Sequence, residues 1–81
     1  MRIDKYLKNA RVIKRRTIAK EACEQGRVLV NGKSAKPGTE VSVGDVIEII
    51  FGTKPMKIQV EQLLEHVVKD AYKDMYKIIN D

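Results

Sequence analysis

The chain has 81 residues, enough for one small domain, and a formal net charge of +5. A mean hydropathy of -0.34 and the lack of any apolar run of about eighteen residues exclude a membrane span, and a single cysteine excludes an internal disulfide. Residues 1–37 hold eleven Lys or Arg against three acids, whereas the remainder holds five Lys and eight acids, which predicts one face that binds a polyanion.

The first predicted element is a short helix over residues 4–10. Asp4 suits its N-cap, because the carboxylate can accept hydrogen bonds from the free amides of the first turn. An apolar stripe at Tyr6, Leu7 and Ala10 indicates the packed side of this helix. Lys5 lies on a different side, so we expect one side to pack and the other to be basic.

Three successive cations, Lys14 to Arg16, stand directly before a second predicted helix over residues 17–25, with Thr17 as its N-cap and Gly26 ending it. A helix N-terminus carries about half a positive charge, so cations placed there are unfavourable unless an anion binds beside them. The free amides of the helix, its dipole and the cationic side chains would then all bind one phosphate. We interpret the segment as an anion-binding site, with a solvated basic loop as the alternative.

A small antiparallel sheet is predicted after the two helices. Asn31 and Gly32 both tolerate positive φ and form the strongest short hairpin signal in the chain. The continuous apolar run at 46–51 indicates the central strand. Strands are expected at 27–30, 33–35, 46–51 and 56–60, with a short extended piece at 41–43. We therefore expect an α+β fold in which two N-terminal helices pack on this sheet.

The last third of the chain has a mixed pattern. A helical period over residues 70–77 predicts a short C-terminal helix packed on the sheet. Tyr72 and Tyr76 lie one turn apart, and we interpret them as core residues, with a partner surface as the alternative. Acids at helical spacing indicate a solvated face in preference to a metal or partner site: Glu61, Glu65, Asp70 and Asp74.

The sequence offers little for catalysis. Cys23 has no second cysteine beside it, so we interpret it as a small buried hydrophobe, and His66 is the single histidine. Neither a GxGxxG motif nor a P-loop occurs. We therefore expect a protein that is not an enzyme and that uses no metal ion and no cofactor.

Three stretches resemble the S-four RNA-binding domain, a family named after a small-subunit ribosomal protein. They are RIDKYL at 2–7, RRTIAKEACEQGRVLVNG at 15–32 and VGDVIEI at 43–49. The resemblance implies an αL motif, a pair of helices set against a small antiparallel sheet, that binds structured RNA. It covers about residues 1–60, so we expect this domain at 1–60 and a C-terminal extension at 61–81 packed on the same domain.

Within this family the chain looks most like the stand-alone bacterial members that act in ribosome-associated quality control, and more distantly like the heat-shock protein fifteen group. The resemblance implies binding to ribosomal RNA of a large subunit that carries peptidyl-tRNA after a stall, and support of C-terminal alanine tailing with an NFACT-type partner. A ribosome-assembly or heat-shock-type rRNA-binding factor is the alternative. We expect a monomer in the reducing cytoplasm, without a secretory signal or membrane partner.

Carried over position by position, the RNA-facing residues of the family fall on cations and strand-turn residues of this chain. Many members have serine where Arg15 stands, so we expect a direct phosphate contact there instead of a hydroxyl contact. Asp4 also matches the family, and we expect it to cap its helix. The expected RNA-binding residues are Arg2, Lys5, Arg11, Lys14, Arg15, Arg16, Arg27, Asn31 and Lys33.

Base stacking is a weak binding mode for this basic face, because Tyr6 is the one aromatic residue near it. Folded RNA contacted through backbone and shape fits the cations better. A helix-turn-helix DNA-binding protein is a rival interpretation. Against it, the connection between the helices ends in three cations, and the second helix offers base edges mainly Lys20, Glu21, Glu24 and Gln25.

Overall fold

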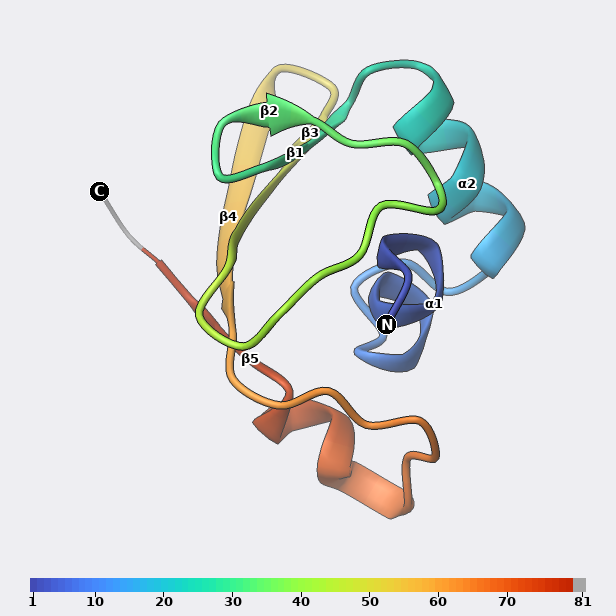
Figure 1. Cartoon of the computed structure of the whole chain (residues 1–81), viewed down its shortest axis with the longest axis vertical. Coiled ribbons are helices and arrows are strands. Elements are labelled where there is room, and N and C mark those ends of the chain that lie inside the picture. The colour runs from blue at the N-terminus through green and yellow to red at the C-terminus, as the bar shows by residue number, and fades with distance from the viewer. Residues whose placement is uncertain (80–81) are drawn as a thin grey trace.

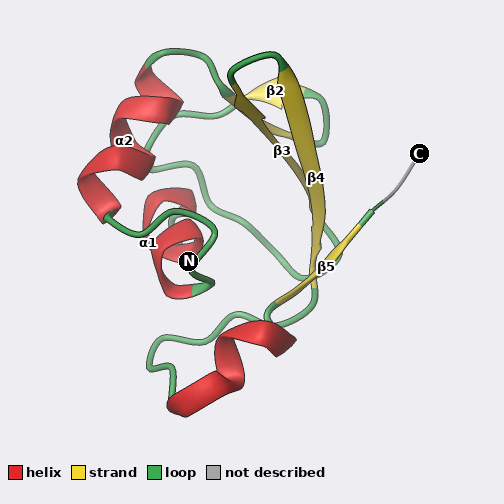
Figure 2. Ribbon diagram, turned by 180° about the vertical axis from the view of Figure 1, so that it is seen from behind, coloured by secondary structure: helices red, strands yellow, loops and turns green. Residues whose placement is uncertain are grey.

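The computed structural model describes residues 1–79, so residues 80 and 81 of the predicted extension 61–81 lie outside the described residues. Two helices, α1 (Ile3–Asn9) and α2 (Arg16–Glu24), lie on one side of a five-stranded antiparallel sheet of order β2-β1-β3-β4-β5 (Figures 1 and 2). The predicted α+β class is confirmed. The other elements are β1 (Val28–Val30), β2 (Lys33–Ser34), β3 (Val46–Phe51), β4 (Lys54–Val60), the 3-10 helix η1 (Lys69–Asp74) and β5 (Tyr76–Ile78).

The first helix begins before its predicted N-cap. Arg2 occupies the N-cap position, but its side chain accepts no hydrogen bond from the helix amides, and Asp4 lies inside the first turn. The Ile3 amide donates to the Thr39 carbonyl over 2.7 Å, and Arg2 forms an isolated antiparallel bridge with Glu40. Pairing with a distant loop therefore sets the helix start and overrides the local capping preference of the aspartate.

The hairpin predicted at Asn31 and Gly32 is confirmed, with φ values of 52° and 84°. Two positive φ values are what a two-residue turn of type I′ requires. β3 is central, as predicted, and pairs with β1 and β4. β4 begins two residues earlier than predicted, and among the described residues the piece at 41–43 is not a strand. Its Val41 amide instead donates to the Met1 carbonyl over 2.9 Å.

The predicted short C-terminal helix is confirmed as the 3-10 helix η1, but its predicted extent of residues 70–77 is wrong. The chain forms the shorter 3-10 helix η1 and then β5, which pairs antiparallel with β4. The Met75 side chain is fully buried, and its carbonyl accepts hydrogen bonds from the Tyr6 hydroxyl (2.6 Å) and the Glu61 amide (2.8 Å). Backbone pairing of residues 76–78 with β4 requires an extended conformation, so the chain leaves the helix at Met75.

The core lies between the two helices and the facing side of the sheet. Cys23 is 4% exposed, which confirms its interpretation as a buried small hydrophobe. Buried side chains come from α1, α2, the sheet and the segment before β5, and include Ile3, Tyr6, Leu7, Ala19, Ala22, Val28, Ile47, Ile49, Ile58, Val60 and Met75. Within residues 1–79, no helix has the length and hydropathy of a membrane span.

Candidate nucleic-acid interface

A buried carboxylate lies between two arginines at the starts of the two helices. Asp4 is 2% exposed, and its Oδ2 atom lies 3.2 Å from Nη2 of Arg2 and 3.5 Å from Nε of Arg16. Its Oδ1 atom accepts a hydrogen bond of 2.8 Å from the Lys5 amide. Asp4 is therefore a positioning residue, which brings together two predicted RNA-binding residues that lie far apart in the sequence.

Arg2 and Arg16 remain open on their outer sides. Their side chains are 49% and 47% exposed. A guanidinium has five N–H donors in one plane, so a contact with Asp4 leaves donors for an incoming anion. Side chains that are already held in place lose less freedom when they bind. The pair therefore has the chemistry of a preorganised phosphate-binding surface.

The N-terminus of α2 lies beside this pair. The prediction of Thr17 as the N-cap is wrong. Arg15, which has an extended backbone, takes that position, and its side chain makes no cap hydrogen bond. In the described structure the first turn of α2 also lacks an acidic residue. The residues of α2 itself therefore neither cap its first amides nor offset the positive end of its dipole, which is consistent with the predicted anion site at residues 14–16.

The loop between the helices presents further cations. Arg11 has a φ of 58°, a left-handed conformation that costs a residue other than glycine about 1–2 kcal/mol. Its guanidinium lies over the ring of Tyr72, 4.5 Å from the centroid, which is a cation–π geometry. Ile13 is buried and anchors the loop, whereas Lys14 and Arg15 are exposed.

Lys5 is the predicted site residue that the C-terminal segment neutralises. Its ammonium forms an ion pair with the Glu65 carboxylate, and this hydrogen bond and charge lower the pKa of Glu65. Within residues 1–79, the other ion pairs of predicted site cations are those of Arg2 and Arg16 with Asp4. The C-terminal segment therefore leaves most of the basic surface open.

Three predicted site residues lie apart from the helix starts, on or beside the first two strands. The turn between β1 and β2 lies on the side away from α1 and α2 (Figures 1 and 2). There the Asn31 amide donates to Asp45 Oδ1 over 3.1 Å. Arg27 Nε donates to a β3 carbonyl over 3.0 Å, and Lys33 is exposed. Asn31 and Arg27 therefore stabilise the sheet, and the structure does not group these three residues with the others.

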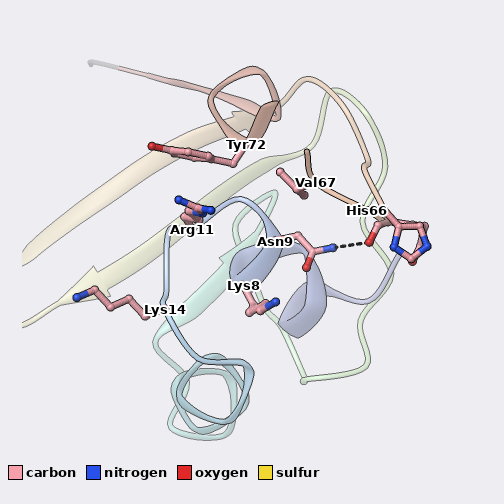
Figure 3. A pocket seen from close by; sticks show the side chains of 8 residues that line it. Lys8, Asn9, Arg11, Lys14, His66, Val67 and Tyr72 are labelled. Carbon is pink, nitrogen blue, oxygen red and sulfur yellow. Dashed lines mark hydrogen bonds between the residues drawn. The ribbon is translucent and has the colours of Figure 1, made fainter. Parts of the chain in front are cut away.

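A hollow of about 720 Å³ opens between the C-terminal end of α1 and the segment before β5 (Figure 3). Sequence reasoning placed two of its residues, Arg11 and Lys14, in the site and missed the rest. Of the residues it missed, Lys8 and Asn9 lie on α1 but were not assigned to RNA binding. The others lie in the C-terminal segment, which the resemblance does not cover. The hollow is lined by residues that include Lys8, Asn9, Arg11, Lys14, His66 and Tyr72.

The aromatic residue at this surface is Tyr72 and not Tyr6. Tyr6 is fully buried, so its ring cannot stack on a base. The same burial raises the pKa of the Tyr6 hydroxyl well above its usual range. Tyr72 is half-buried beneath Arg11, which lies sixty-one positions earlier, so no local pattern could have paired them. Among the described residues, no group of three His, Cys, Asp or Glu side chains is placed to hold a metal ion.

Comparison with known proteins gives full-length relatives. The chain is 52% identical over all 81 residues to the RQC P-site tRNA stabilizing factor of Listeria monocytogenes, of which it covers 88%. It is 43% identical over 81 residues to the factor of the same name from Bacillus subtilis, of which it covers 94%. The predicted likeness to quality-control members is thereby confirmed.

A solved structure extends the comparison to the fold. Heat shock protein 15 of Vibrio cholerae, described as trimeric, is 30% identical with a TM-score of 0.88, and the match covers 98% of this chain and 81% of that one. The S4 domain family model matches residues 1–47, which contain α1, α2, β1, β2 and the start of β3. This match confirms the resemblance to the S-four RNA-binding domain. The chain therefore belongs to the S4 domain family.

Proposed function

We propose that this protein is an RNA-binding factor of ribosome quality control that acts on stalled large ribosomal subunits carrying peptidyl-tRNA. The observation that carries the proposal is a sequence identity of 52%, in an alignment that spans all 81 residues, with a protein named for stabilising P-site tRNA. The likeness extends past the S4 match at 1–47 to the C-terminal segment. It therefore supports a shared role as well as a shared RNA-binding fold.

The proposed contact surface has Arg2 and Arg16 at its centre, with the exposed Lys14 and Arg15 beside them. Contacts of this kind with phosphates position a protein on folded RNA, and they make binding weaken steeply as salt rises. We infer that the protein recognises the backbone and shape of ribosomal RNA or tRNA more than its sequence.

The proposed partners are ribosomal RNA of the large subunit, peptidyl-tRNA and an NFACT-type protein that carries out alanine tailing. We propose that the chain supports this synthesis by binding and not by catalysis, because the S4 domain match and the names of the relatives describe a binding factor. A cytoplasmic monomer is the proposed state. Heat shock protein 15 of Vibrio cholerae is described as trimeric, so light scattering on the free protein is the test of the monomer.

A ribosome-assembly or heat-shock-type rRNA-binding factor is the second candidate, favoured by the TM-score of 0.88 with heat shock protein 15. The helix-turn-helix interpretation has less support. Glu21 and Glu24 are both exposed on α2, and carboxylates on a recognition helix would repel DNA phosphates.

Affinity purification of the tagged protein after induced translation stalling tests the proposal. We expect free large subunits that carry peptidyl-tRNA to copurify with the wild type, and R16A to lose them. K54A removes one exposed charge at the first residue of β4, outside the proposed contact surface, and serves as the matched control. Recovery of immature subunits without tRNA would favour the second candidate, and recovery of chromosomal DNA would contradict both.

A further inference from the structure

The hollow between α1 and the C-terminal segment is a concave site that the proposed contact surface around Arg2 and Arg16 does not include. Its volume of about 720 Å³ lies within the range of roughly 300–1,000 Å³ that small-ligand sites occupy. A lone phosphate would fill only a small part of such a space. The hollow therefore has room for a group of the size of a nucleotide.

The charge of the lining favours an anion. Lys8, Arg11 and Lys14 contribute three cations, and all three side chains are exposed. Among the described lining residues the one carboxylate is Glu65, and the ammonium of Lys5 already neutralises it. A phosphate entering the hollow would therefore meet a net positive charge.

The wall of the hollow that comes from the C-terminal segment is fixed to α1. The Asn9 side-chain amide donates to the carbonyls of Leu64 (3.0 Å) and Glu65 (3.3 Å), and the Lys5–Glu65 ion pair lies beside these bonds. A wall held by several bonds does not have to be ordered when a ligand binds. The site is therefore largely formed before binding.

Arg11 supplies a flat surface inside this hollow. Its guanidinium lies 4.5 Å from the centroid of the Tyr72 ring, and in Figure 3 it lies on the side of Tyr72 that faces Lys8. The positive φ of Arg11, 58°, is a costly conformation held where the side chain meets that ring. Planar guanidinium groups are surfaces on which unpaired RNA bases stack.

We propose that the hollow binds one unpaired nucleotide of a folded RNA, with the base stacked on the Arg11 guanidinium and the phosphate held by Lys8 and Lys14. Tyr72 contacts the other face of the guanidinium, and its ring keeps the guanidinium in the orientation that stacking requires. This inference rests on the proposed RNA-binding function. It adds that the protein distinguishes an RNA helix with an extruded base from a continuous helix.

Two RNA hairpins of the same stem sequence test the inference. One carries a single bulged 2-aminopurine, and the other carries 2-aminopurine paired in the stem. We expect the wild type to bind the bulged hairpin about five- to tenfold more tightly, and the emission of the bulged base to change on binding. R11K keeps the charge but lacks the flat group, so the preference and the emission change should disappear. Y72L should have the same effect.

Y76L makes the same change at a half-buried tyrosine that does not line the hollow, and it should keep the preference. Equal affinity of the wild type for both hairpins would overturn the inference, as would a preference that survives in R11K. If R11K weakened both hairpins equally, Arg11 would contact phosphate alone, and the nucleotide site would again be wrong. Cosedimentation with large ribosomal subunits is measured separately, and its failure would instead contradict the proposed function.

Discussion

Nε of Arg16 lies 3.5 Å from Oδ2 of Asp4, a carboxylate that is 2% exposed at the start of the other helix. The contact joins the first turns of α1 and α2, and Nη2 of Arg2 lies 3.2 Å from the same oxygen. A buried anion thus holds two half-exposed cations close together. This arrangement explains how cations at a helix N-terminus are tolerated in the free protein, and it leaves their remaining donors facing solvent.

Replacing either arginine should weaken RNA binding with little loss of stability. We expect R16A and R2A each to lower affinity for large ribosomal subunits, and to reduce the slope of log affinity against log salt by about one unit. The loss of stability should stay below about 1 kcal/mol, because each arginine is half-exposed and Asp4 keeps the other guanidinium and the hydrogen bond from the Lys5 amide. Cosedimentation at several salt concentrations measures the first effect, and thermal unfolding the second.

K54A is the matched control, since it removes one exposed charge outside the basic surface. Unchanged cosedimentation of both R16A and R2A would remove these residues from the proposed interface.

Asp4→Asn separates positioning from simple charge. The substitution raises the net charge by one, so attraction to a polyanion alone would strengthen RNA binding. If Asp4 instead orients Arg2 and Arg16, affinity for large subunits should fall although the charge has become more favourable. D70N makes the same chemical change at an exposed position and should bind as the wild type or slightly more tightly. Stronger binding by D4N would mean that orientation does not matter.

Much of the fold follows from local sequence signals, and its exceptions share one cause. The Asn31-Gly32 hairpin and the central strand were predicted because turn chemistry and apolar continuity act within a few residues. The start of α1 and the end of η1 were misplaced because groups from distant parts of the chain bond there. The Ile3 amide pairs with a loop beyond β2, and the Met75 carbonyl pairs with Tyr6.

The candidate site, like the fold, could be predicted from the sequence only where the signal is local. The cations before α2 were identified from sequence, because their excess at a helix N-terminus is a local electrostatic anomaly. The role of Asp4 was not, since an aspartate before an apolar stripe fits an N-cap equally well. The contact between Arg11 and Tyr72 depends on how the C-terminal segment folds back onto α1, which no local pattern encodes.

Tyr6→Phe should destabilise the protein. The Tyr6 hydroxyl donates a buried hydrogen bond of 2.6 Å to the Met75 carbonyl, so its removal forfeits that bond at a cost of about 1–2 kcal/mol. For a domain of this size that cost corresponds to a fall of roughly 5–15 °C in the thermal midpoint. Y76F removes a hydroxyl from a half-buried ring and is the control. Equal midpoints for Y6F and Y76F would show that the buried bond contributes no net stability.

Cys23 should make stability fall in alkaline solution. Burial, followed by the charges of Asp4 and Glu24, raises the pKa of the Cys23 thiol from 9.0 to about 11. Between these values the unfolded chain loses the proton while the folded chain keeps it, so stability is full below the lower value and declines as pH rises above it. We expect a loss of about 1 kcal/mol between about pH 7.5 and pH 9.5, measured by urea unfolding. In C23A this part of the loss should vanish, and an identical decline in both proteins would assign it to other groups.

Removing the C-terminal segment should unfold the domain. A chain ending at residue 60 lacks β5 and the fully buried Met75, and it leaves the Tyr6 hydroxyl without its acceptor. The loss of one buried methionine side chain costs about 2–5 kcal/mol, and a small domain has only about 5 kcal/mol of stability in total. We expect the 1–60 chain to show no cooperative thermal transition by circular dichroism and poorly dispersed amide resonances. In the full-length chain, M75A should stay folded with a lowered midpoint, whereas V68A, at a side chain 70% exposed, should match the wild type. A cooperative transition of the 1–60 chain near the full-length midpoint would mean that the S4 domain is stable by itself and that the C-terminal segment serves binding alone.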